Sequence, residues 1–281
     1  MAVIRSVTLS RGDFMNVGFI GAGSMGAMLI RALVRGGAVT PAQVWVSNRS
    51  PQKLARLAGE VPGIHTADSA RVVAECSMVF LCVKHGDTAA ALDAMHAQLR
   101  PDQLLITLAS VLPLPWLEER VPCRVAKVIP SLTQEVLKGP CLVIWGSRIR
   151  PPDAAMVRGL LERISLPVII PEAQRRICAD LASAAPAFLA WLLASMAEAA
   201  TRFQPDLATE VASTLVREMA IGTAALLADQ SVTFEEIVRR VATPGGMTEA
   251  GLGVLGRQMP GIWEQLYREM QNREAELAGK L

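Results

Sequence analysis

The stretch NVGFIGAGSMGAM, from Asn16 to Met28, decides how the rest of the chain is interpreted. A short apolar run leads into a glycine cluster and then into apolar residues at helical spacing, which predicts strand, turn and helix in that order. Three of its glycines have the G-x-G-x-x-G spacing that lets a dinucleotide pyrophosphate rest on the N-terminus of the helix. The alternative is a glycine-rich turn that binds nothing, but the flanking strand and helix favour a cofactor site. The expected cofactor contacts in this loop are Gly21, Gly23, Ser24, Met25 and Gly26.

The composition predicts a soluble, cytoplasmic protein with two domains. The chain has 281 residues, is 51% hydrophobic and carries a net charge of +2. No cluster of basic residues with interleaved aromatic residues is present, so no nucleic-acid partner is expected. The 5 cysteines are odd in number and contain no C-x-x-C pair, which predicts neither a disulfide framework nor a metal site.

Residues 1–14 do not resemble a secretion signal, because Arg5, Arg11 and Asp13 interrupt any apolar stretch. Met15 stands immediately before the first predicted strand. We therefore expect residues 1–14 to be a disordered extension, and both Met1 and Met15 fit as the start of translation.

A second strand, Gln43–Ser47, indicates which dinucleotide the chain prefers. An NAD enzyme usually has an acidic residue at the end of this strand to hold the ribose 2′-hydroxyl, and this chain has none there. Hydroxyl, amide and guanidinium groups stand there instead, which suits the extra phosphate of NADP. The alternative is that the arginine is an ordinary turn residue. The residues concerned are Ser47, Asn48, Arg49 and Ser50.

The apolar run Met78–Val83 is typical of a central parallel strand. Because ligands bind at the carboxyl ends of strands in such sheets, Val83, Lys84 and His85 are expected to face the cofactor. His85 as a catalytic acid or base is a less favoured alternative to its lining the ribose pocket.

Strand and helix patterns alternate up to residue 170 and only helical patterns follow. This predicts an NADP-binding α/β Rossmann domain with a doubly wound, mainly parallel sheet at 1–170 and an all-α domain at 171–281. The family resemblance given below implies that this second domain serves dimerisation and substrate binding. The helical part divides into three blocks, with Asp206 expected to cap the second. The blocks are Ala173–Phe203, Asp206–Asp229 and Gly261–Leu277.

The run Leu181–Ala197 carries no charge, so it could be either a membrane span or a buried helix. It is slightly short of the roughly 20 residues that a bilayer requires and includes Pro186. We prefer a buried helix whose burial is completed by a second subunit, and expect no membrane partner.

A second motif, TPGGMTEAG from Thr243 to Gly251, follows in the helical part. Its adjacent glycines form a loop whose N–H groups could converge on an anion, with Thr248 opening the next helix. A plain Pro-Gly turn with a threonine N-cap fits the residues equally well.

At this point the chain resembles the pyrroline-5-carboxylate reductases over most of its length, from Met15 to Glu276. The resemblance implies a Rossmann domain that binds NADPH and a helical domain that forms an intertwined homodimer, with dimers that can assemble further. It also implies reduction of a cyclic imine acid to proline at a site made by both domains and both subunits. The matching segments are VGFIGAGSMG (Val17–Gly26), SNRSPQKLARL (Ser47–Leu57), VFLCVK (Val79–Lys84), SAAPAFLAWL (Ser183–Leu192) and TPGGMTEAGLGVL (Thr243–Leu255).

Carried over by position, the resemblance makes Thr248 the catalytic residue, with its hydroxyl near the imine nitrogen. It also implies that Thr243 and the backbone of Gly245 and Gly246 hold the substrate carboxylate. Neither a nucleophile nor a metal is needed, because an iminium carbon already accepts hydride.

The chain departs from the family pattern at its expected active site. Ser131 replaces the asparagine of an M-P-N-T-P segment, and His85 replaces a proline. Arg239 stands in the approach to the substrate loop, and Ala185 replaces a glycine. These departures leave the substrate open, and with it a non-catalytic dimeric NADP-binding protein with a regulatory role. A hydroxyacid dehydrogenase would need a lysine or histidine between residues 180 and 200, where none stands.

Overall fold

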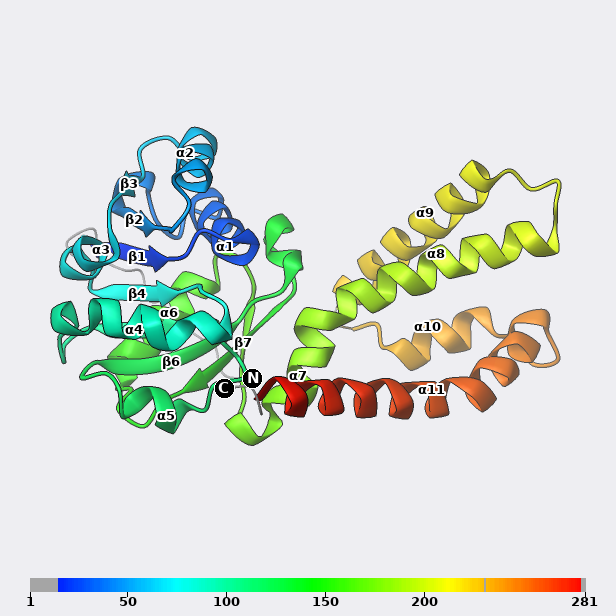
Figure 1. Ribbon diagram of the computed structural model, residues 1–281. Coiled ribbons are helices and arrows are strands. Elements are labelled where there is room, and N and C mark those ends of the chain that lie inside the picture. Colours follow the sequence, from blue (N-terminus) through cyan, green and yellow to red (C-terminus); the bar gives the residue numbers. More distant parts are fainter. Residues whose placement is uncertain (1–14, 230, 279–281) are drawn as a thin grey trace. The chain divides into compact units, whose positions relative to one another are not determined.

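The computed structural model describes residues 15–229 and 231–278 (Figure 1). Two compact units divide the chain, one formed by Met1–Ala184 with Glu274–Leu281 and the other by Ala185–Arg273. The division lies later than residue 170 because Ala179 and Ala182 are buried in the core on one face of the sheet. The extension predicted at residues 1–14 lies outside the described residues.

The first unit contains one eight-stranded sheet with the order β3-β2-β1-β4-β5-β6-β7-β8. Neighbouring strands are parallel except β6 and β7. Those two strands run antiparallel, and the connection between them contains the 3₁₀ segment η4 (Leu132–Val136) but no crossover α-helix. The strands are β1 (Val17–Ile20), β2 (Val44–Ser47), β3 (His65–Thr66), β4 (Met78–Leu81), β5 (Leu104–Thr107), β6 (Arg124–Ile129), β7 (Pro140–Trp145) and β8 (Leu166–Ile169).

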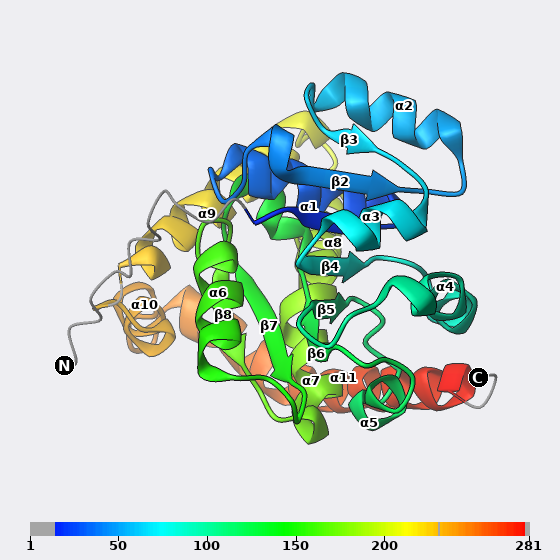
Figure 2. The same cartoon turned by 90° about the vertical axis from the view of Figure 1, so that its left-hand side faces the viewer.

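Helices cover both faces of this sheet, so the predicted doubly wound Rossmann fold is confirmed. The core on one face is built with α1 (Ser24–Arg35), α2 (Pro51–Glu60) and α6 (Pro151–Leu161). The core on the other face includes α3 (Ser69–Glu75), α4 (Thr88–Met95) and α5 (Leu114–Glu118). Figure 2 shows α6 on one side of the strands and α3, α4 and α5 on the other.

Short 3₁₀ or π segments connect several of these elements. The segments are η1 (Pro41–Gln43), η2 (His85–Asp87), η3 (His96–Gln98), η4 (Leu132–Val136), η5 (Glu172–Gln174) and η6 (Asp180–Ala184). The first unit also contains α7 (Arg175–Ala179), which leads into η6.

A buried lysine, Lys127, links the segment that follows β5 to η5. Lys127 on β6 is fully buried, and its ammonium donates to the carbonyls of Ser110 and Leu112 at 3.1 and 2.7 Å. It also pairs with Glu172 at 2.5 Å. Burial lowers the pKa of Lys127, and the Glu172 carboxylate opposes that shift. The pair holds the segment after β5 against η5.

The second unit is helical, as predicted. Its helices are α8 (Ala185–Phe203), α9 (Thr209–Ala228), α10 (Phe234–Val241) and most of α11 (Met247–Ala278). The predicted cap at Asp206 is wrong. Helix α9 begins at Thr209 with Ala208 at its N-cap, and the Asp206 carboxylate accepts a hydrogen bond from the Gln204 amide instead. Helix α11 begins well before the predicted Gly261, although it includes Pro260.

Two helical stretches have the length and hydropathy of a membrane span, namely Glu172–Phe203 and Thr209–Ala228. Length and composition alone are weak support for a span. Only 17% and 6% of their most apolar windows are buried, and Leu189 and Trp191 are exposed. The single chain therefore does not bury the run Leu181–Ala197, and its burial by a second subunit stays a prediction.

Candidate functional site

The glycine loop between β1 and α1 has the geometry of a phosphate cradle. Gly21 has a φ of +107°, and a Cβ there would lie 2.8 Å from the Cys82 carbonyl oxygen. A Cβ on Gly26 would collide with the Gly21 carbonyl, whereas one on Gly23 would meet nothing within 4 Å. Gly23 also caps α1 without a side-chain hydrogen bond. The N-terminus of α1 is therefore open on the side from which an anion would approach.

Two residues predicted to contact the 2′-phosphate also support the glycine loop. The Asn48 side-chain oxygen accepts the Ala22 N–H at 3.0 Å, and its amide nitrogen donates to the Ser50 carbonyl at 3.2 Å. Ser47 is buried, with its hydroxyl 3.0 Å from that of Ser69. The Ser47 carbonyl accepts the Gly21 N–H at 2.8 Å. These contacts tie the loop to the end of β2.

The other two residues of that group lie at the surface. Ser50 caps α2 by accepting the Lys53 N–H, and Pro51 is the first residue of that helix. The Arg49 side chain is 86% exposed and pairs with Asp87 at 2.8 Å. Asp87 ends η2, which follows β4, so this ion pair joins the segments that follow the two strands beside β1. The spacing of the G-x-G-x-x-G motif does not predict the ion pair between Arg49 and Asp87.

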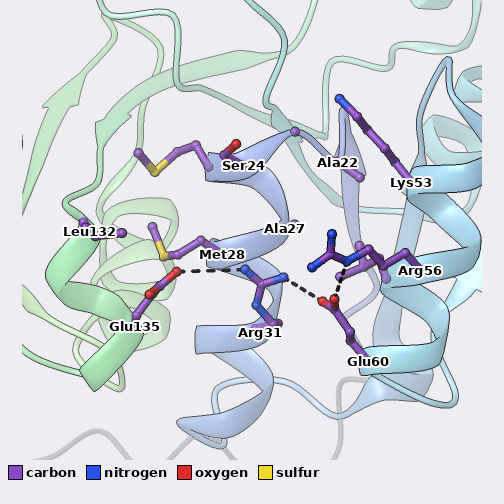
Figure 3. Close-up of a pocket in the computed structure, with 13 residues that line it drawn as sticks. Ala22, Ser24, Ala27, Met28, Arg31, Lys53, Arg56, Glu60, Leu132 and Glu135 are labelled. Carbon is purple, nitrogen blue, oxygen red and sulfur yellow. Dashed lines mark hydrogen bonds and ion pairs between the residues drawn. The ribbon is translucent and has the colours of Figure 1, made fainter.

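A pocket of about 350 Å³ lies beside α1 (Figure 3). Ser24 and Met25 contribute to it from α1, and Leu132 contributes from η4. Lys53 and Arg56 contribute from the first two turns of α2, and neither belongs to the predicted cofactor contacts. Their three-residue spacing, just after the N-cap of α2, is the signal that places both on one face of the helix.

Glu60 balances part of the positive charge around this pocket. It accepts hydrogen bonds from Arg56 and Arg31, each at 2.8 Å. The Arg56 hydrogen bond lowers the pKa of Glu60 and burial raises it, and the added hydrogen bond and charge of Arg31 keep the pKa below its ordinary value. Figure 3 shows the two arginines converging on Glu60, while Lys53 extends on the Ala22 side of the pocket.

The segment after β4 lies beside the glycine loop at the carboxyl ends of the strands. Strand β4 pairs with β1, and the Cys82 N–H donates to the Ile20 carbonyl at 2.8 Å. Val83 is half-buried, Lys84 is exposed and His85 is half-buried at the start of η2. These three residues therefore follow the carboxyl end of β4, and their contact with a cofactor stays a prediction.

Ser131, which stands where the family pattern has asparagine, is fully buried after β6. Its N–H donates to the Gln134 side-chain oxygen at 2.5 Å, and its hydroxyl accepts from that of Thr133 at 3.1 Å. Its polar groups therefore close a local turn.

The loop Thr243–Thr248, TPGGMT, belongs to the second unit and has its own internal partners. The Gly245 N–H donates to a Glu249 carboxylate oxygen at 2.7 Å, and the Gly246 N–H donates to the Thr243 carbonyl at 2.9 Å. The two amides predicted to hold a substrate carboxylate are thus already paired. Thr248 lies in the first turn of α11, as predicted, and its side chain is exposed.

No group of three or more histidine, cysteine, aspartate or glutamate side chains is arranged to hold a metal in residues 15–229 and 231–278. The cysteines described there are free. Burial raises the pKa of Cys76 and Cys141 to about 12, so neither has thiolate character near neutral pH.

Two families match separate parts of the chain. Residues 16–110 match "NADP oxidoreductase coenzyme F420-dependent", and residues 172–277 match "Pyrroline-5-carboxylate reductase dimerisation". The first match contains the glycine loop, and the second contains the TPGGMT loop.

Similar proteins cover nearly the whole chain. ComE operon protein 4 of Bacillus subtilis is 31% identical, over 92% of this chain and 93% of that protein. Pyrroline-5-carboxylate reductase of Pseudomonas aeruginosa is 28% identical, over 94% and 97%. The crystal structure of Plasmodium falciparum pyrroline carboxylate reductase with NADP bound covers 94% of this chain and 97% of its own, with a TM-score of 0.78 at 18% identity. That structural likeness supports the fold.

Proposed function

Because the chain belongs to the pyrroline-5-carboxylate reductase family, we propose that it is an NADPH-dependent reductase of a cyclic imine. The family is one of NADP-dependent oxidoreductases. Pyrroline-5-carboxylate, the compound in the names of several relatives, is the first substrate to test, and a related cyclic imine is the next. We further propose that the chain works as a cytoplasmic homodimer.

The cradle at the N-terminus of α1 is the observation that carries the proposal. The open space beside Gly23 leaves room for a pyrophosphate. Any side chain at this position would occupy that space. Arg49 and Lys53 supply positive charge near the end of β2, and no acidic residue stands among residues 47–53 to receive a ribose 2′-hydroxyl. These residues fit NADPH better than NADH.

The chemistry of imine reduction assigns a role to each part of the proposed site. When bound, NADPH supplies a hydride to the imine carbon while a proton joins the nitrogen, giving an amine and NADP⁺. The glycine loop holds the pyrophosphate, and Arg49 with Lys53 faces the 2′-phosphate. Thr248 places its hydroxyl near the imine nitrogen. Alignment of this kind can lower the barrier by about 7 to 11 kcal/mol.

A second candidate, a non-catalytic NADP-binding regulator, is favoured by one observation. The buried Ser131 cannot supply the side-chain amide that the family pattern has at this position. Such a protein would bind NADPH through the same cradle and reduce nothing.

The test is an assay of NADPH consumption with pyrroline-5-carboxylate and a set of other cyclic imines. We expect the near-ultraviolet absorbance of NADPH to fall with at least one imine. Thr248→Ala should lower kcat/KM about a hundredfold if the hydroxyl acts on the reacting nitrogen. Thr209→Ala, at the exposed start of α9, is the matched control and should leave the rate unchanged. NADPH binding without consumption by any imine would favour the regulator.

A further inference from the structure

The TPGGMT loop contains a carboxylate of its own where the substrate carboxylate is expected. Glu249 stands in the first turn of α11 and reaches back to the Gly245 N–H, with 2.7 Å between oxygen and nitrogen. Gly245 has a φ of +71°, a left-handed conformation that favours glycine. Its N–H is therefore held by a charged acceptor, which makes a stronger hydrogen bond than a neutral acceptor would.

The neighbouring amide offers no second free donor. The Gly246 N–H donates to the Thr243 carbonyl at 2.9 Å, and a Cβ on Gly246 would lie 2.6 Å from the Thr243 hydroxyl oxygen. The turn is closed around its own backbone. An incoming carboxylate would have to displace the Glu249 side chain or break the turn.

Charge opposes a second carboxylate even if it finds another donor nearby. The partial positive charge at the N-terminus of α11 is already balanced by Glu249. Two carboxylates about 4 Å apart in water repel each other by roughly a fivefold factor in affinity, and by more where water is excluded. A ring without a carboxylate meets no such repulsion.

We propose that Glu249 is a specificity-determining residue that competes with the carboxylate of an imine acid, so that the TPGGMT loop favours cyclic imines without a carboxylate. The inference rests on the proposed function and refines its substrate class. Under it, pyrroline-5-carboxylate is a poor substrate, and 1-pyrroline, the same ring without the acid, is a better one.

Glu249 also has a structural role, because an acidic side chain at this position stabilises the start of a helix. Glu249→Gln separates the two roles. A glutamine oxygen can still accept the Gly245 N–H, while the negative charge is removed. Glu264→Gln, an exposed position further along α11, is the matched control for loss of one charge from the same helix.

The experiment measures kcat and KM for pyrroline-5-carboxylate and for 1-pyrroline in the wild type and both variants, with NADPH. Glu249→Gln should raise kcat/KM for the acid about five- to tenfold, mainly through KM, and leave 1-pyrroline within twofold. Glu264→Gln should change neither. Equal losses with both substrates would show that Glu249 only stabilises the helix, and this result would overturn the proposal.

A binding measurement keeps the inference separate from the question of catalysis. Calorimetry would titrate L-proline, which carries the carboxylate, into each protein saturated with NADP⁺. We expect tighter binding to Glu249→Gln than to the wild type. Equal affinity for both proteins, or binding to neither, would overturn the role of Glu249. Absence of turnover with every imine would instead remove the proposed function.

Discussion

At the scale of single residues, the three glycines of the loop after β1 differ in what surrounds them. A Cβ on Gly26 would collide with the backbone carbonyl of Gly21, which cannot move without opening the turn. A Cβ on Gly23 would meet open space. Gly26→Ala should therefore destabilise the first unit by about 1 to 3 kcal/mol, since the helix must shift. Thermal unfolding without cofactor would measure this effect.

Gly23→Ala is the matched comparison, and it should behave differently. Without cofactor its unfolding temperature should equal that of the wild type, because the added methyl contacts nothing. NADPH should then raise the unfolding temperature of the wild type and have little effect on Gly23→Ala. A Gly23→Ala protein that still binds NADPH with the affinity of the wild type would contradict the placement of the pyrophosphate.

Residue types predicted the cradle but not the hydrogen bonds within it. The spacing of Gly21, Gly23 and Gly26 was sufficient to predict the cradle, because the local backbone requires a glycine at each of these positions. The partners of Asn48 were not predictable, because its side chain bonds to Ala22, which is distant in the sequence. The bond between Glu249 and Gly245 was not predictable either, because it depends on the exact conformation of the turn.

At the scale of elements, the end of α11 is held to α7 by a cluster of charges within the first unit. Glu274 accepts hydrogen bonds from Arg175 at 2.6 Å and Arg176 at 3.5 Å. Burial raises the pKa of Glu274, but the hydrogen bonds and charges of Arg175 and Arg176 outweigh burial and hold this pKa below its ordinary value. Arg176 also pairs with the buried Asp180.

Glu274→Gln should release the end of α11. Loss of a half-buried, charged hydrogen bond costs about 1 to 3 kcal/mol, so the amides at 274–277 should exchange hydrogen faster. In the wild type this contribution is complete above pH 4.5 and is lost as the pH falls through the lowered pKa of Glu274. Glu269→Gln, an exposed position on the same helix, should leave the exchange unchanged. Equal protection in Glu274→Gln and wild type would mean that other contacts hold the segment.

The elements that sequence predicted well are those in which one local signal dominates. Buried parallel strands have continuous apolar runs, and the predicted run Met78–Val83 contains β4. Helix α11 was placed too late because its glycines and Pro260 have low helix propensity. The hydrogen bond from the Gly245 N–H to Glu249 stabilises the start of this helix, and helix propensities do not include such a contact. The role of Lys127 was not predictable, because only the folded chain shows which carbonyls accept its hydrogen bonds.

At the scale of the whole molecule, the second unit leaves an unusual amount of apolar surface exposed for a single chain. Helix α8 buries only Ala197 of its residues, and α9 buries only Ala212. Phe203 is 90% exposed and Trp191 is 69% exposed. A helix of a soluble protein normally buries an apolar stripe, so these helices need a further partner. The match of residues 172–277 to a dimerisation family supports a second copy of the chain as that partner.

The prediction is a homodimer that depends on one face of α8. Leu189 and Met196 lie two helical turns apart and are each 57% exposed, so they belong to one exposed stripe. The double variant Leu189→Glu with Met196→Glu should lower the mass in light scattering from two chains to one, because burying two unpaired charges opposes association. Glu198→Gln, exposed on the same helix, should stay dimeric. A wild type with the mass of one chain, or one recovered with membranes, would show that these helices are covered in another way.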